Sequence, residues 1–140
     1  MRALATAAVL AASVAAVLSG SLAASPKPAA IYTAAQAAAG GKAYAASCAA
    51  CHGENLEGGA GPALSGANLK TLQKSTHLTV SDLWEFVTLQ MPMNAPGSLP
   101  KAQYAEIVAY ILKFNGYPAG AKSLTPASAD ASKILVTSLK

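Results

Sequence analysis

The sequence has few of the side chains from which proteins build a metal site without help from a cofactor. It contains two cysteines, two histidines and six acidic residues in 140. A structural zinc site needs about four ligands. Beyond Cys48, Cys51 and His52, only His77 offers a further sulfur or imidazole donor. A zinc site is therefore disfavoured.

Three further function classes lack their sequence signals. The glycine-rich stretch 53–66 is not followed by a lysine at the spacing of a nucleotide-binding loop. No strand and helix patterns alternate, as a dithiol oxidoreductase of the thioredoxin type would require. The lysines are scattered along the chain, so no basic cluster indicates nucleic-acid binding.

The only long apolar run lies at the N-terminus. Arg2 precedes a run of 16 small or apolar residues, 3–18, which is short for a membrane span of about 20 residues. A basic start, an apolar middle and small residues at Ser21-Leu22-Ala23 are typical of a secretory signal peptide. We therefore expect a signal peptide over 1–23, export to the periplasm, and no stable membrane insertion after cleavage. An uncleaved anchor is the alternative. The cleavage point has no cysteine, so a lipidated N-terminus is not supported.

The remaining chain has room for one domain, since domains commonly have about 100–150 residues. Pro26 and Pro28 indicate an extended linker over 24–32. The domain itself is expected over 33–118. Residues 119–140, rich in Ala and Ser, are expected to form a C-terminal tail that is poorly ordered or wrapped on the surface.

A first helix is predicted from Thr33 to about Ser47, because Thr33 and Gln36 fit a capping box. Gly40 and Gly41 each cost this helix about 1 kcal/mol relative to alanine. Gly40 shares a face with Tyr44 and with Cys48, so a bare glycine there would let another helix approach closely. The alternative is a shorter helix that ends at the glycines.

Two more helices are predicted, and no strand, so the fold class is all-α. One runs over 81–90, with Ser81 as its cap, Asp82 in the first turn and Trp84 buried. The other runs over 101–114 and stops at Asn115-Gly116. Residues 68–79 show no clean period. The buried stripe of the last helix is expected to consist of Tyr104, Ile107, Val108, Ile111 and Leu112.

The residues with the clearest chemistry are Cys48, Cys51 and His52. Two thiols three positions apart, with a histidine directly after the second, have the spacing of c-type haem attachment. A disulfide, a redox dithiol or half of a zinc site would also use a CxxC pair. Haem attachment also explains the presence of His52, which would then approach the iron from one face.

Two methionines lie in a proline-rich segment, 91–97, rather than on a helical face. Met91 or Met93 could supply a thioether to iron opposite His52, and Met/His ligation raises the reduction potential of a haem. We favour Met91 over Met93. His77, in a polar surround, is a weaker candidate and is expected to be exposed.

Four motifs follow one another along the chain: Cys48–His52, Gly61–Leu64, Met91-Pro92 and Ala109–Leu112. In their order and rough spacing, the chain over 33–116 resembles the class I c-type cytochromes. The resemblance implies a small cytochrome c fold in which the N- and C-terminal helices cross and loops enclose the haem.

The resemblance also implies roles for individual residues. The two helices would cross at Gly40, Tyr44 and Tyr110. The Pro62 carbonyl would accept a hydrogen bond from His52, and Met91 would be the sixth ligand. One departure from the family is Pro100, where relatives commonly place a hydroxyl cap for the last helix.

The function implied is that of an electron carrier rather than an enzyme, with one covalent haem c and its iron. Its partners would be redox proteins, with a terminal oxidase or another cytochrome as acceptor. Similarity of the segments 91–99 and 115–118 to periplasmic cytochromes that serve quinoprotein alcohol dehydrogenases suggests such an enzyme as donor. Two alternatives remain: a haem c subunit of a dehydrogenase or oxidase complex, and a haem enzyme or gas binder with an open sixth position.

Overall fold

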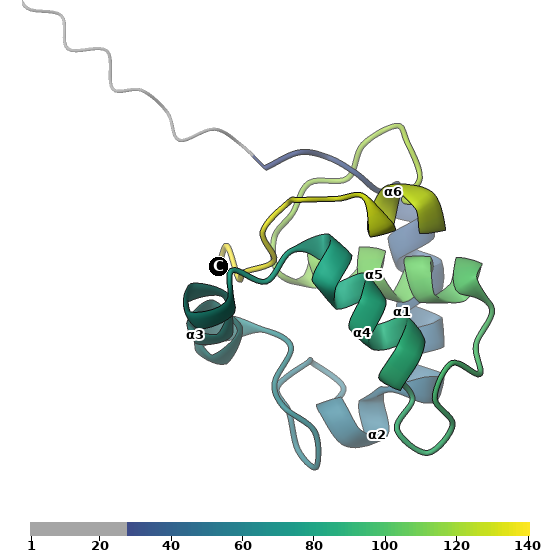
Figure 1. The fold of residues 1–140 in the computed structure, drawn as a ribbon, viewed down its shortest axis with the longest axis vertical. Coiled ribbons are helices and arrows are strands. Elements are labelled where there is room, and N and C mark those ends of the chain that lie inside the picture. The colour runs from purple at the N-terminus through teal and green to yellow at the C-terminus, as the bar shows by residue number, and fades with distance from the viewer. Residues whose placement is uncertain (1–27) are drawn as a thin grey trace, which may run out of the picture.

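The computed structural model describes residues 28–140, and the signal peptide expected over 1–23 lies outside them. Over 28–140 the chain forms helices and no strand, with one isolated bridge between Thr79 and Leu135. The expected all-α class is confirmed. In chain order the helices are α1 (Ala34–Ser47), α2 (Ala49–His52), α3 (Gly66–Thr76), α4 (Val80–Gln90), α5 (Lys101–Phe114) and α6 (Pro126–Asp130) (Figure 1).

Helix α1 runs through both of its glycines, so the alternative of a shorter helix is wrong. Thr33 caps it as predicted, accepting a hydrogen bond from the Gln36 N–H at 3.1 Å, but the predicted capping box is incomplete because the Gln36 side chain binds Leu124 instead. Gly40 is buried against α5: a Cβ atom there would lie 1.8 Å from the backbone oxygen of Glu106. The absence of a side chain at Gly40 is therefore what lets the two backbones touch.

Aromatic rings pack beside this crossing. The ring centroids of Tyr44, on α1, and Tyr110, on α5, lie 5.2 Å apart with the planes tilted by 45°. Offset and tilted aromatic pairs at such separations are favourable. The crossing of α1 and α5 at Gly40, Tyr44 and Tyr110 confirms the arrangement that the family resemblance implied.

Helix α5 has the predicted bounds, although its cap, Pro100, provides no side-chain hydrogen bond. All five residues of the predicted stripe are buried. The helix stops where predicted: Gly116 has a φ of 94°, which favours glycine. The buried Asn115 side chain donates to the carbonyls of Leu64 and Ile111, both at 2.9 Å.

Helix α4 starts earlier than predicted, and its cap is Thr79 rather than Ser81. The Thr79 hydroxyl accepts from the Asp82 N–H at 3.2 Å, and the Asp82 carboxylate accepts from the Thr79 N–H at 2.8 Å. This reciprocal pair satisfies two backbone donors that a helix end leaves free. Ser81 lies within the first turn, where its hydroxyl donates to the Asp130 carbonyl. Trp84 is buried as expected.

Helix α3 occupies most of the segment for which the sequence showed no period. Leu69 is its one buried residue, so only a single apolar position marks its inner face. A helix that buries so little has no periodic apolar stripe to detect. It ends at His77, which is exposed, as expected, with a left-handed φ of 54°.

Both ends of the described chain pack against the domain. Tyr32, assigned to the linker 24–32, is 1% exposed, and its hydroxyl donates to the Tyr117 carbonyl. Of the two alternatives for residues 119–140, here called the C-terminal strap, the structure shows the second, a segment wrapped on the domain, because Leu124 and Val136 are buried. The Gln36 side chain on α1 binds both the N–H and the carbonyl of Leu124, at 2.8 and 2.6 Å.

The C-terminal strap runs beside the start of α4. Val136 donates to the Leu78 carbonyl and Val80 to the Ile134 carbonyl, both at 2.8 Å.

In the part of the chain covered by the structure, no helix combines the length and apolar character that a bilayer span requires.

We expect Gly40→Ala to destabilise the protein by about 3 kcal/mol or more. The added Cβ would meet Glu106 backbone, which cannot move without separating α1 from α5. Gly41→Ala is the matched control, because its Cβ would meet only the Tyr110 ring, at 3.3 Å, and alanine favours the helix. Denaturant unfolding followed by circular dichroism measures both. Equal stabilities would contradict the close crossing.

We expect the α4 cap to make stability depend on pH. Hydrogen bonds from the Thr79 side chain and backbone lower the pKa of Asp82 from its ordinary value of 3.8. A lowered pKa stabilises the fold above the unfolded value, and this advantage is lost as the pH falls through the folded value. Wild type should therefore be more stable than Asp82→Asn at neutral pH, and the difference should shrink below pH 3.8. A difference in unfolding midpoint that stays constant with pH would contradict this.

Candidate functional site

The three motif residues are brought together by one turn of chain directly after α1. The Cys48 N–H closes α1 by donating to the Tyr44 carbonyl at 2.8 Å. The Cys48 carbonyl then accepts from the N–H groups of Cys51 and His52, at 3.1 and 2.9 Å. As a result Cys48, Cys51 and His52 all line the same cavity.

The imidazole of His52 is held in one orientation. It is 9% exposed, and its Nδ1 lies 2.8 Å from the Pro62 carbonyl oxygen, the contact that the resemblance implied. A carbonyl can only accept, so Nδ1 carries the proton and donates. This leaves the lone pair of Nε2 free for a metal, in the usual arrangement of a metal-ligating histidine.

Gly61 makes room for this imidazole. A Cβ atom on Gly61 would lie 2.8 Å from Cε1 and 2.9 Å from Nδ1 of His52. Any larger residue would therefore push the ring away from the position in which it meets Pro62.

The glycine-rich loop 53–66 folds back onto the motif. Gly61 donates to the Cys51 carbonyl and Gly58 to the His52 carbonyl, both at 2.8 Å. Leu56 is fully buried beneath the loop, and its carbonyl accepts from Leu64 at 2.9 Å. These bonds satisfy the carbonyls of the short helix α2 and fix Pro62 opposite His52.

The loop after α4, residues 91–99, brings both candidate methionines to the same cavity. Met91 is partly buried, whereas Met93 is 74% exposed. The Met91 carbonyl accepts from the Tyr104 hydroxyl at 2.5 Å and from the Gly97 N–H at 3.1 Å. Met91 is thus the less exposed of the two methionines, and its backbone carbonyl is held by two hydrogen bonds.

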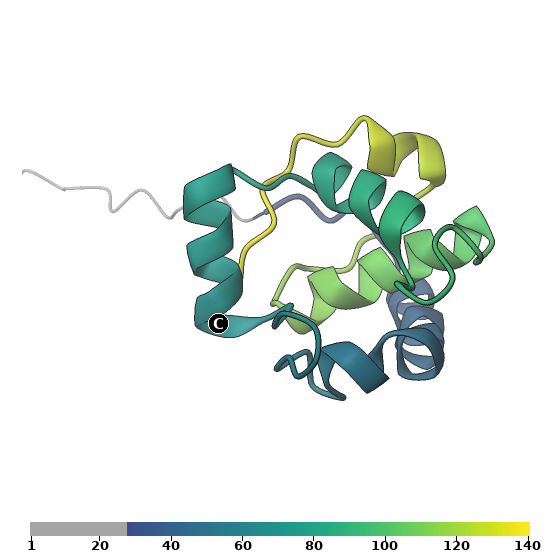
Figure 2. The same cartoon turned by 60° about the horizontal axis from the view of Figure 1, so that its bottom comes forward.

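The cavity has a volume of about 750 Å³, within the range of roughly 300–1,000 Å³ that is usual for cofactor sites. Figure 2 shows α2 and α4 on either side of α5. Exposed residues, among them Cys51 and Asn94, form part of the cavity lining, so the cavity opens to the surface. The apolar wall comes from α4, α5 and two loops: Leu64, Val87, Leu99, Ile107 and Ile111.

This combination of groups fits a haem. The apolar wall would suit a porphyrin, the two thiols of the lining are available for thioether bonds, and Nε2 of His52 and a thioether could offer nitrogen and sulfur donors to an iron.

The alternatives for the CxxC pair fit less well. Burial, with a smaller effect of Cys51, raises the pKa of the Cys48 thiol to about 11. Dithiol catalysis depends on a thiolate with a lowered pKa, so the environment is the reverse of what that chemistry needs. His77, the fourth donor considered for zinc, does not line the cavity. Over 28–140 no group of three His, Cys, Asp or Glu residues could hold a metal ion.

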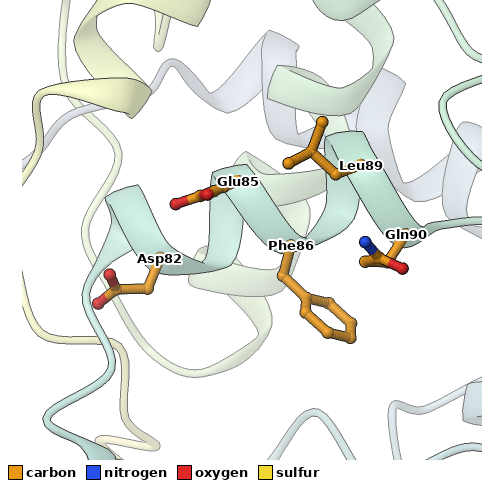
Figure 3. Close-up of a pocket in the computed structure, with 5 residues that line it drawn as sticks. All are labelled: Asp82, Glu85, Phe86, Leu89 and Gln90. Carbon is orange, nitrogen blue, oxygen red and sulfur yellow. The ribbon is translucent and has the colours of Figure 1, made fainter.

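A second, smaller depression of about 240 Å³ lies on the exposed face of α4. One helix supplies its entire lining, and the labelled side chains of Phe86 and Leu89 point in different directions (Figure 3). It therefore brings no set of groups together from different elements. Its lining consists of Asp82, Glu85, Phe86, Leu89 and Gln90.

Sequence reasoning placed several cavity residues in the ordinary core. Tyr104, Ile107 and Ile111 were predicted as a buried stripe, and they are buried, but they also line the cavity. Helical spacing identifies an inward face without telling whether a neighbour or a cofactor covers it. Trp84, which is buried as expected, does not line the cavity.

Comparisons with known proteins agree with this site. A family profile described as "Cytochrome C oxidase, cbb3-type, subunit III" matches residues 35–111, more than half of the chain. The matched segment includes Cys48, Cys51, His52 and Met91. No curated protein matches the chain.

The fold is similar to that of a chain in the crystal structure of the sulfane dehydrogenase SoxCD from Paracoccus pantotrophus, with a TM-score of 0.53. The two chains are 23% identical, and the match covers 71% of this chain and 52% of the other. This chain therefore spans about half the length of that neighbour, and the likeness shows the fold alone.

We expect Gly61→Ala to tilt the His52 ring and to destabilise the haem-loaded protein by about 1–3 kcal/mol, because the new Cβ would crowd the imidazole. Electron paramagnetic resonance of the oxidised protein measures the tilt, since its g-values report the orientation of an axial imidazole. Gly41→Ala, whose Cβ would meet Tyr110 instead, should leave the g-values unchanged. Unchanged g-values in Gly61→Ala would show that the ring is not confined by this loop.

Proposed function

The chain belongs to the class I c-type cytochromes, and from this membership we propose that it is a periplasmic monohaem electron carrier whose iron is ligated by His52 and Met91. The family carries covalently bound haem c, which supplies a one-electron Fe(III)/Fe(II) couple. The geometry of the cavity is the main support for the finer assignment.

In this proposal Cys48 and Cys51 form the thioether bonds to the porphyrin. Both line the cavity, and neither is engaged in a disulfide. The turn that contains them also carries His52, so covalent attachment and axial ligation are set by the same few backbone hydrogen bonds. The single observation that carries the assignment is the 2.8 Å contact of His52 Nδ1 with Pro62, which directs Nε2 to the metal.

Met91 would complete the coordination of the iron. A thioether opposite an imidazole raises the reduction potential and leaves no position for substrate, which suits electron transfer. Met91 is preferred to Met93 because it is partly buried and its carbonyl accepts two hydrogen bonds. The gas-binding and peroxidase alternative would require this position to stay open.

Electrons would pass through the open rim of the cavity to partner proteins. Such partners commonly dock through small, transient interfaces of less than about 1,200 Å². The signal-peptide pattern of 1–23 supports a periplasmic location. Similarity to cytochromes that serve quinoprotein alcohol dehydrogenases supports such an enzyme as donor, with a terminal oxidase or another cytochrome as acceptor.

A second candidate is that the chain is a haem c subunit of a larger complex. The name of the matching family refers to an oxidase subunit, and the structural neighbour is a chain of a dehydrogenase, of which the match covers 52%. Native purification from periplasm and from membranes distinguishes the two. A carrier should elute alone at the size of one chain, whereas a subunit should copurify with a fixed set of other chains.

We expect Met91→Ala to abolish the weak red absorption band that reports sulfur bound to ferric iron, and to lower the reduction potential. Met93→Ala is the matched control, two residues away in the same loop, and should retain the band. The measurement is a redox titration of the haem-loaded proteins followed by absorbance. Loss of the band in Met93→Ala alone would assign the ligand to Met93, and a colourless wild type would refute haem attachment.

A further inference from the structure

The loop that carries Met91 has few contacts with the rest of the domain. Residues 93–98 are all exposed. Three backbone hydrogen bonds stay within the loop: Ala95 donates to the Pro92 carbonyl at 2.8 Å, Gly97 to the Met91 carbonyl at 3.1 Å and Ser98 to the Ala95 carbonyl at 3.2 Å. Such bonds shape the loop but do not hold it against α5. Its position must therefore be fixed at its two ends.

One buried side chain joins those two ends. Tyr104 lies in the first turn of α5, is 2% exposed and lines the cavity. Its hydroxyl donates to the Met91 carbonyl at 2.5 Å and accepts from the Leu99 N–H at 3.4 Å. A single hydroxyl group is thus bonded to the first and to the last residue of the loop.

We propose that Tyr104 is a positioning residue that clasps loop 91–99 and thereby keeps the sixth coordination position of the iron closed. This inference rests on the proposed function, because it takes Met91 as the ligand. Tyr104 need not touch the metal, since it acts on the backbone of the ligating residue. The clasp then decides whether the protein behaves as an electron carrier or admits small external ligands.

The expected effect of losing the hydroxyl follows from the bonds that remain. Without it, the Met91 carbonyl keeps only the Gly97 N–H, at 3.1 Å, and the Leu99 N–H loses its partner. The loop would open more often while α5 keeps its place. The loss of one net hydrogen bond corresponds to a population of open loop about three to ten times larger.

The test is the rate at which the reduced, haem-loaded protein binds carbon monoxide. Tyr104→Phe keeps the ring that fills the core and removes only the hydroxyl, so we expect binding about three to ten times faster than in wild type. Tyr110→Phe is the matched control: it removes a hydroxyl from the same helix at a residue that does not line the cavity, and its rate should equal that of wild type. An unchanged rate in Tyr104→Phe would overturn the proposal.

A double-mutant cycle separates a clasp on Met91 from a general change in the cavity. If Tyr104 acts through Met91, Tyr104→Phe should cause no further acceleration in a Met91→Ala background. An equal acceleration in both backgrounds would refute the clasp.

Amide hydrogen exchange gives a readout that does not depend on which methionine ligates. In Tyr104→Phe the Gly97 and Leu99 amides should exchange about three to ten times faster, as in a loop that opens more often. If Met91→Ala leaves carbon monoxide binding slow while these amides respond to Tyr104→Phe, the ligand assignment fails and the clasp on the loop stands. If the amides do not respond, the clasp itself is wrong.

Discussion

The contact between the backbones of α1 and α5 at Gly40 is the constraint from which the rest of the site follows. Because a glycine lies against the Glu106 carbonyl, the backbones of the two helices are in contact where they cross. Helix α1 leads directly into the turn of Cys48, while α5 supplies Ile107 and Ile111 to the cavity wall. The distance between the turn that contains Cys48 and the cavity wall on α5 is therefore set by this close crossing.

Helix α5 also serves the other border of the cavity. Its first turn binds the loop of Met91 through Tyr104, and the residue that ends it, Asn115, binds the Leu64 carbonyl in the segment that follows Pro62. The loop of Met91 and the loop that holds His52 in place are thus both hydrogen-bonded to the same helix, α5. Loops are usually the variable part of a fold, and tying both to a buried helix gives the site a defined geometry.

The features that sequence predicted well are those with a local cause. The N-cap of Thr33, the stripe on α5 and the stop at Gly116 each depend on residues a few positions apart, and each is present. The spacing of Cys48, Cys51 and His52 likewise identified the site from adjacent residues alone.

The features that it missed have distant causes or weak patterns. Thr79, rather than Ser81, caps α4, and both are hydroxyl residues near the same helix start, so type alone did not separate them. Helix α3 buries only Leu69 and left no periodic trace. The C-terminal strap packs by contacts with residues far away in the sequence, such as Gln36 with Leu124. The spacing of apolar residues along α5 could not show which buried positions line a cavity and which pack in the core.

The direction of α1 has a consequence for how the domain can be attached to anything else. Tyr32 lies just before this 14-residue helix and Cys48 just after it, so about 21 Å of helix separates them. The strap joins Tyr32 at that far end, through Gly120. In Figure 1 the N-terminal segment and α6 lie at the opposite end of the molecule from α2. A tether or fused module joined ahead of Tyr32 would leave the mouth of the cavity unobstructed.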